Sequence, residues 1–203
     1  MKTLKVLVIG WLAGGAFVVL LSLWPRTVAQ PRVTGSRLPA AGGVALETRP
    51  LGHRSPGTII VPVAGIPSSA LYDSYTQPRG HGRMHGAIDI MAPRGTPVVA
   101  AVDGTIRKLF TSAGGGLTIY QFDPAEERVY YYAHLQSYAN GVAEGLFVRQ
   151  GTVIGYVGTS GNAAPDAPHL HFSVELLPPT KEWWKGTPVN PYPLLTGAAS
   201  ALP

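Results

Sequence analysis

Between residues 58 and 176 the chain consists of short runs rich in β-branched and aromatic residues, each broken by glycine or proline. The runs lie at residues 58–63, 87–91, 96–102, 105–110, 117–122, 129–135, 152–157 and 169–176. Short strands with frequent turn residues between them are typical of an antiparallel β domain. Residues 58–196 span about 140 positions, a usual size for one domain with a core of its own. The sequence therefore predicts a mainly β fold built on an antiparallel sheet.

The first 24 residues differ in kind from the rest. Lys2 and Lys5 give a basic start, and no charged residue occurs from Val6 to Trp24. That stretch is close to the ~20 residues that span a bilayer, whereas signal peptides carry an apolar core of ~7–15 residues. The length favours an uncleaved transmembrane anchor. A cleaved signal peptide stays open, because Ala29 follows the stretch as a small residue at a weak cleavage site.

Both readings of residues 1–24 export the remainder of the chain. We expect a membrane-anchored protein whose domain lies outside the cytoplasm, periplasmic or extracellular, or a secreted one if the segment is cleaved. Residues 25–57 are rich in Pro, Gly, Ala and Arg without sustained periodicity, which is typical of a linker. Residues 197–203 are small and are expected to form a frayed tail.

Charge and cysteine content narrow the partners and the chemistry. The formal net charge is +5, which is consistent either with solubility or with attraction to an anionic partner. Nucleic acid is disfavoured because no basic cluster or stripe is visible, so an anionic polymer of the cell envelope is the more natural partner. The chain has no cysteine. Any metal must therefore be held by histidines and carboxylates.

Histidines provide the main functional signal. Asp89 follows His85 by four residues, His169 and His171 are two residues apart, and His134 lies between these segments. Strand alternation places His169 and His171 on one face, and turns Asp89 away from its isoleucine neighbours. If these faces meet in one groove, five ionisable groups converge over an apolar sheet.

A catalytic zinc site uses three protein ligands and keeps a fourth position for water, whose pKa zinc lowers to about 7. Further imidazoles can transfer protons and stabilise an oxyanion. One aspartate and four histidines suffice for both tasks. The helical motif of two histidines around a glutamate is absent from the sequence.

Several segments resemble motifs of the lysostaphin-type zinc metallopeptidases, the LytM-type family of peptidoglycan endopeptidases. They are residues 83–90 (RMHGAIDI), 92–98 (APRGTPV), 132–135 (YAHL), 158–162 (GTSGN), 168–172 (PHLHF) and 188–191 (PVNP). Their order and approximate separations also agree with the family. The resemblance covers roughly residues 58–196.

This resemblance implies a mainly antiparallel, barrel-like β domain with a groove across its sheet. It implies that His85, Asp89 and His171 bind Zn²⁺, while His134 and His169 stay unliganded and serve catalysis. The implied activity is hydrolysis of peptide bonds in bacterial peptidoglycan, with zinc-held water as the nucleophile. A protein activator is not identified, and the bond that is cut is not specified. Ser173 departs from the pattern, because many members have glutamate there.

Two other readings use the same β-rich sequence. One is a non-catalytic envelope module that binds peptidoglycan or activates another hydrolase, against which the complete histidine set argues. The other is a carrier-type barrel, because residues 95–104 and 151–155 resemble strand–turn units of biotinyl or lipoyl domains. Neither segment contains the lysine that such domains modify.

The remaining conspicuous residues favour structural roles. His81 is expected in a turn before the first ligand, although a substrate contact is open, and His53 is expected to be solvated. Tyr130 and Tyr132 share a face with His134 by alternation, so they either line the groove or pack elsewhere. Trp183 and Trp184 are expected to form an apolar lid over the domain edge, and residues 114–116 (GGG) a hairpin turn.

Overall fold

The computed structural model describes residues 9–12, 15–18 and 58–197, without the side chains of residues 9–12, 15–18 and 81. The chain divides into two units, Met1–Arg49 and Pro50–Pro203. In the first unit, strand β1 (Ile9–Leu12) pairs antiparallel with β2 (Gly15–Val18). No helix in the described ranges is both long and apolar enough to cross a membrane. The rest of the predicted anchor and the linker lie outside those ranges, so both stay predictions.

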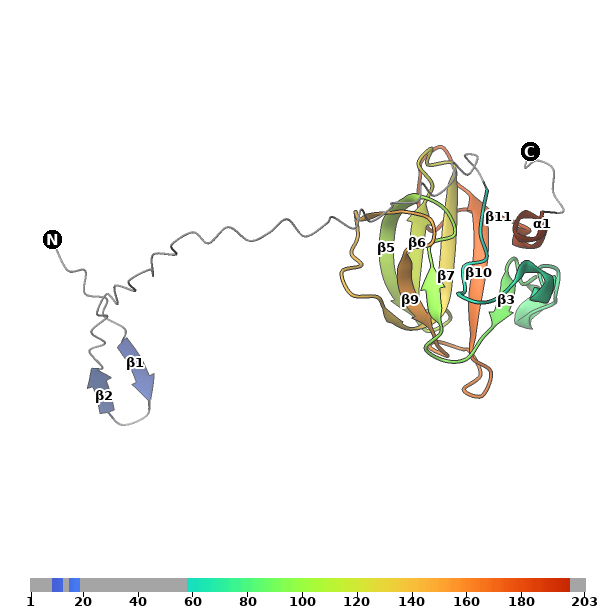
Figure 1. The fold of residues 1–203 in the computed structure, drawn as a ribbon. Helices are drawn as coiled ribbons and strands as arrows, with labels where there is room; N and C mark the ends of the chain where they lie inside the picture. The colour runs from blue at the N-terminus through green and yellow to red at the C-terminus, as the bar shows by residue number, and fades with distance from the viewer. Residues whose placement is uncertain (1–8, 13–14, 19–57, 198–203) are drawn as a thin grey trace, which may run out of the picture. The chain divides into compact units, whose positions relative to one another are not determined.

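The second unit is a nine-stranded antiparallel sheet, as the sequence predicts (Figure 1). Its strands are β3 (Ile88–Met91), β4 (Pro97–Val99), β5 (Gly104–Ser112), β6 (Gly116–Phe122), β7 (Arg128–Tyr138), β8 (Phe147–Val148), β9 (Val153–Val157), β10 (His169–Leu176) and β11 (Thr187–Val189). Short 3₁₀ turns η1 (Ser68–Ala70) and η2 (Gly80–Gly82) precede β3. Helix α1 (Pro191–Thr196) follows β11.

The sheet is open and branched rather than a closed barrel. Its main path runs β11-β10-β7-β6-β5-β8. Strand β7 borders β6 on one side, while its other side pairs first with β10 and then with β9, which also pairs with β4. Strand β10 likewise borders β3 and then β11 along one side. The long strands β7 and β10 therefore join the short strands β3, β9 and β11 into one sheet.

One predicted strand is not formed. Residues 58–63 run beside β4, where Ile60 N–H donates to the Ala101 carbonyl and Val99 N–H to the Pro62 carbonyl, each at 3.0 Å. Only Val63 makes a bridge, to Val98. Pro62 has no N–H to donate, so regular pairing is interrupted there.

The core lies on one face of this sheet and follows the predicted alternation in the short strands. Ile88, Ile90, Leu170 and Phe172 are all buried in it. Since successive side chains of a strand point to opposite faces, the polar residues between them are turned to the other face. Burial of these apolar neighbours fixes the register, because a one-residue slip would put the polar side chains into the core.

Strand β7 breaks the alternation at His134. The backbone of His134 has a φ of 61°, and the pairing of β7 with β6 shifts between Leu117 and Ile119. Such a bulge inserts one residue and changes the face of the side chains that follow. Tyr130 and Tyr132 are buried in the core, so the prediction that they share a face with His134 is wrong.

The turn between β5 and β6 explains how the bulge is held. The Gly115 carbonyl accepts a hydrogen bond from His134 N–H at 2.8 Å. A Cβ atom on Gly115 would lie 2.1 Å from the Tyr131 hydroxyl oxygen, so a larger residue there would have to displace the Tyr131 side chain. The predicted hairpin turn at residues 114–116 is confirmed, and it also supports the site.

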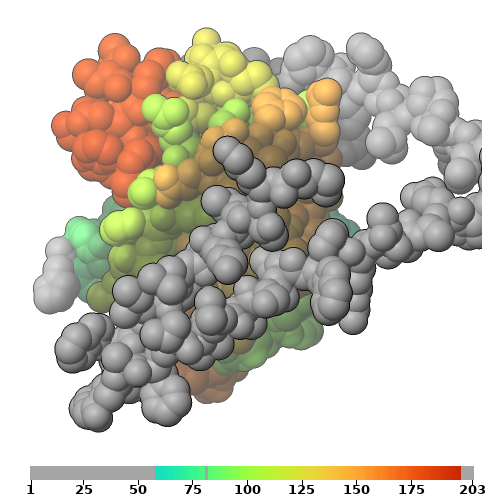
Figure 2. Space-filling view, turned by 90° about the vertical axis from the view of Figure 1, so that its left-hand side faces the viewer, coloured from blue at the N-terminus to red at the C-terminus, as the bar shows by residue number. Residues whose placement is uncertain are grey.

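The tryptophan loop, residues 177–186, packs on the face of the sheet opposite the core. The ring of Trp183 lies 4.6 Å from Tyr120 and 5.5 Å from Phe110, measured between centroids. Leu177 N–H donates to the Glu127 carbonyl at 2.9 Å. Figure 2 shows this red-orange loop beside the yellow turn that joins β6 and β7. Trp183 thus forms the expected lid contact, while Trp184 is 57% exposed.

Candidate active site

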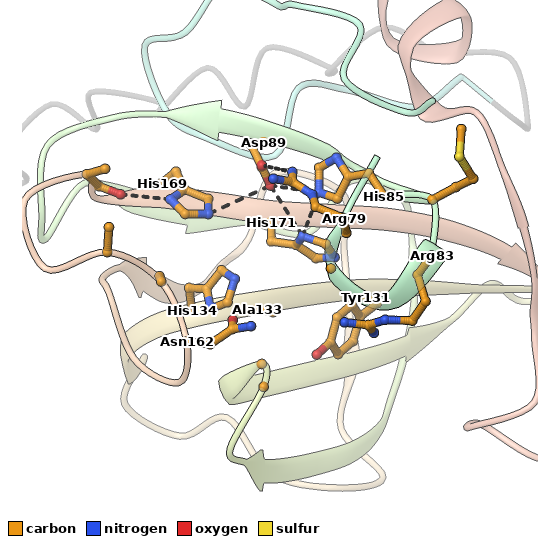
Figure 3. Close-up of a pocket in the computed structure, with 17 residues that line it drawn as sticks. Arg79, Arg83, His85, Asp89, Tyr131, Ala133, His134, Asn162, His169 and His171 are labelled. Carbon is orange, nitrogen blue, oxygen red and sulfur yellow. Dashed lines mark hydrogen bonds and ion pairs between the residues drawn. The ribbon is translucent and has the colours of Figure 1, made fainter. Parts of the chain in front are cut away.

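One pocket collects all five predicted site residues (Figure 3). Asp89 comes from β3 and His85 from the segment just before it. His169 and His171 come from β10, and His134 from the bulge of β7. His171 pairs directly with Asp89 across the β3–β10 ladder. The predicted convergence of their faces over the sheet is therefore observed.

His85, Asp89 and His171 form the tightest group in the pocket. His85 Nε2 lies 3.0 Å from His171 Nδ1, and Asp89 Oδ1 lies 3.1 and 3.2 Å from those two nitrogens. Zinc bonds of ~2.0–2.1 Å at tetrahedral angles place ligand atoms ~3.3 Å apart. The three atoms thus form a nearly equilateral triangle of the size that a zinc ion requires.

The hydrogen bonding of the Asp89 carboxylate in this triangle is incomplete. Its Oδ1 atom is buried and has no hydrogen-bond partner of good geometry. A buried carboxylate oxygen without a partner is costly. A cation bound to the three ligand atoms would satisfy it, so these residues could hold a metal ion.

The segment before β3 orients both ends of the ligand pair. The Ser74 carbonyl accepts a hydrogen bond from His85 Nδ1 at 3.0 Å, which leaves the Nε2 lone pair for a metal. The Ser74 hydroxyl accepts from the Asp89 backbone N–H at 3.1 Å. Ser74 is only 3% exposed. Sequence reasoning missed this residue because it lies outside every motif, in an irregular segment.

Arg79 forms an ion pair with the second oxygen of the Asp89 carboxylate. Its Nη2 atom lies 2.6 Å from Asp89 Oδ2, the oxygen that does not face the two imidazoles. Burial alone would raise the pKa of Asp89, but the electrostatic influence of the adjacent His171 and His85 imidazoles outweighs it and holds that pKa well below its usual value. Asp89 is therefore an anionic ligand at any pH near neutrality.

His134 and His169 are held in a common way. His134 Nδ1 donates to the Ser160 carbonyl and His169 Nδ1 to the Ala167 carbonyl, both at 2.8 Å. Each Nε2 then carries a lone pair, and His169 Nε2 lies 3.7 Å from Asp89 Oδ1. The two rings are 4.9 Å apart between centroids. Two oriented bases therefore stand beside the ligand triangle.

Burial favours the neutral form of two imidazoles in the pocket, those of His134 and His171. It lowers the pKa of His134 to about 4, although the hydrogen bond to the Ser160 carbonyl partly opposes it. Burial also lowers the pKa of His171, against the opposing effect of Asp89. Both rings are neutral at pH 7, the state that a proton acceptor and a metal ligand need.

Four other residues that the sequence singles out differ in their positions relative to the pocket. Tyr131 lines it, although alternation through His134 turns Tyr131 to the opposite face. Ser173 does lie on the histidine face, but its hydroxyl donates to Glu175 at 2.8 Å. His81 belongs to η2, and His53 lies outside the described residues.

Comparison with known proteins agrees with this geometry. The L-Ala–D-Glu endopeptidase of Bacillus subtilis is 35% identical over 124 residues, which are 58% of this chain and 36% of that protein. The DD-carboxypeptidase/endopeptidase Mpg of Neisseria meningitidis is 38% identical over 109 residues, which are 54% of this chain and 22% of that protein. This chain thus spans about a third or less of each relative's length.

A solved structure shares the fold. The catalytic domain of the antimicrobial peptidase lysostaphin from Staphylococcus simulans superposes with a TM-score of 0.51 at 32% identity, over 60% of this chain and 87% of that domain. The model of peptidase family M23 matches residues 83–191, more than half of the 203 residues, and this range contains all five pocket residues. The chain therefore belongs to peptidase family M23.

Proposed function

We propose that the chain is a zinc-dependent endopeptidase that hydrolyses peptide bonds in bacterial peptidoglycan. The observation that carries the proposal is the triangle of His85, Asp89 and His171, with ligand atoms 3.0–3.2 Å apart and an unpartnered Asp89 oxygen. Family membership and the names of the relatives support a peptidase that acts on cell-wall peptides.

The proposed roles divide the residues into ligands and proton carriers. When bound, zinc would polarise the substrate carbonyl and lower the pKa of water to about 7. His134 and His169 would accept the proton of the attacking water through Nε2 and pass a proton to the leaving amine. Their carbonyl partners at Ser160 and Ala167 keep both rings aimed at the reacting atoms.

Mass spectrometry of digested peptidoglycan tests this proposal. Purified, zinc-loaded protein is incubated with sacculi, and the released fragments are analysed for new amino and carboxyl termini. We expect peptide cleavage that disappears on chelation and returns when zinc is added. The His134→Ala and His169→Ala variants should keep the metal but lose at least ~100-fold in rate.

A matched control separates catalysis from binding. His81→Ala removes an imidazole close in sequence to the first ligand and is expected to leave cleavage unchanged. Protein that sediments with sacculi, retains zinc and releases no fragments would overturn the proposal in favour of the non-catalytic envelope module.

We also propose export, with residues 1–24 as a membrane anchor and the domain outside the cytoplasm. The uncharged stretch from Val6 to Trp24 supports this placement. Cell fractionation and the mass of the mature protein test it. Full-length protein in the membrane fraction is expected, and cytoplasmic protein with an intact N-terminus would contradict it.

A further inference from the structure

Two arginines line the pocket, and only one of them, Arg79, pairs with a carboxylate. Arg79 and Arg83 are the basic residues other than histidine that line it, and Asp89 is the acidic one. Arg79 is bound to Asp89. Among the described side chains, Arg83 has neither a hydrogen bond nor an ion pair, although it borders the site.

The backbone around Arg83 is held in place. The Arg83 carbonyl accepts from Arg79 N–H at 2.8 Å, Met84 bridges to Pro78, and His85 N–H donates to the Gln77 carbonyl at 2.9 Å. Arg83 itself is extended, with φ −81° and ψ 151°. In an extended segment, residues two apart point to the same side, so Arg83 projects on the side of His85.

This position lies at a defined end of the pocket. Figure 3 shows Arg83 with Tyr131 at one end, and His134 and His169 at the other. Arg83 and His85 are two residues apart in an extended segment, a separation of about 6.6 Å. Two residues of an extended substrate span the same length. Arg83 can therefore reach a group on a residue within about two positions of the bond held at the ligand triangle.

We propose that Arg83 selects substrates that carry a free carboxylate within about two residues of the bond to be cut. This inference rests on the proposed peptidase function. A guanidinium presents a planar pair of N–H donors that matches both oxygens of a carboxylate. Stem peptides of peptidoglycan carry several free carboxylates, and converting one to a carboxamide removes its charge while its size is kept.

The test combines variants of the protein with variants of the substrate. Full-length, zinc-loaded wild type, Arg83→Gln and Arg83→Lys are assayed on crosslinked stem peptides that are amidated at one carboxylate at a time. For the wild type, amidation of one particular carboxylate should lower kcat/KM at least about tenfold. Arg83→Gln should lose a similar factor on the free carboxylate and become indifferent to that amidation. Arg83→Lys, which keeps the charge without the paired donors, should fall between them.

Two controls make the result specific. Arg107→Gln removes an exposed arginine of β5 that lies over Phe122, outside the pocket, and should leave the discrimination unchanged. Metal content should stay the same in every variant. Wild type that cleaves all amidated peptides at one rate, or Arg83→Gln that still discriminates, would overturn the inference. Failure of the wild type to cleave any peptide would instead overturn the proposed function.

Discussion

At the scale of single residues, Ser74 links two proposed metal ligands through one buried side chain and its carbonyl. Sequence motifs name the atoms that bind a metal, but not the partners that orient them. Metal ligands are commonly fixed by such outer contacts, whose loss costs about 10–100-fold in metal affinity. Ser74 therefore belongs to the site although it lies 15 residues before Asp89.

We predict that Ser74→Ala weakens zinc binding by about 10–100-fold. The change removes the hydroxyl that accepts the Asp89 N–H, while the carbonyl that holds His85 remains. Competition with a chromogenic chelator measures the affinity. Ser68→Ala, at an exposed serine in η1, serves as the control and should bind zinc like the wild type. Equal affinity in the Ser74 and Ser68 variants would contradict the role given to Ser74.

At the scale of elements, the bulge in β7 determines which side chains reach the pocket. A positive φ is rare for a residue with a Cβ and costs about 1–2 kcal/mol. The strain sits at His134, a proposed catalytic residue, and is balanced by the bond from its N–H to Gly115. The site is thus built on a departure from regular strand geometry.

We predict that His134→Gly is more stable than His134→Ala by about 1 kcal/mol, because glycine adopts this backbone conformation without strain. Both variants lose the imidazole, so their difference isolates the backbone. Unfolding in denaturant measures it. At Thr111, an exposed position of β5 that pairs regularly with Leu117, the order should reverse, since glycine weakens a regular strand. An alanine variant at 134 as stable as the glycine variant would show that the bulge is not strained.

Strand β10 carries a partly buried carboxylate, that of Glu175, which opposes folding at neutral pH. Burial raises the pKa of Glu175, and the Ser173 hydroxyl only partly offsets this. Since the folded state holds that proton more tightly than the unfolded state, the stability contributed by Glu175 falls as pH rises above about 4.5.

We predict that Glu175→Gln raises Tm at pH 7–8 and that this gain vanishes below about pH 4.5. Thermal unfolding across this range measures the effect. Glu144 is the control in which the pKa shifts in the opposite direction, because hydrogen bonds from Lys108 and the Leu109 N–H lower its pKa. Glu144→Gln should therefore be no more stable than the wild type at neutral pH. A Glu175→Gln gain that is independent of pH would refute the electrostatic explanation.

At the scale of the whole molecule, local patterns predict the sheet and the five converging residues. Alternation succeeds for Asp89, His169 and His171 because β3 and β10 are regular and bury apolar residues on one face. It fails for Tyr131 because the bulge depends on Gly115, a residue of the turn between β5 and β6. Arg79 and Ser74 could not be predicted, since irregular backbone brings them to the ligands.

Metal content by mass spectrometry tests the central claim most directly. Wild type, Asp89→Ala, His171→Ala, His134→Ala and His169→Ala are purified, loaded with zinc and washed under identical conditions. The division into three ligands and two proton carriers predicts one zinc ion per chain in the wild type and in the His134 and His169 variants, and almost none in the Asp89 and His171 variants. Zinc retained by His171→Ala, or lost from His169→Ala alone, would contradict this assignment.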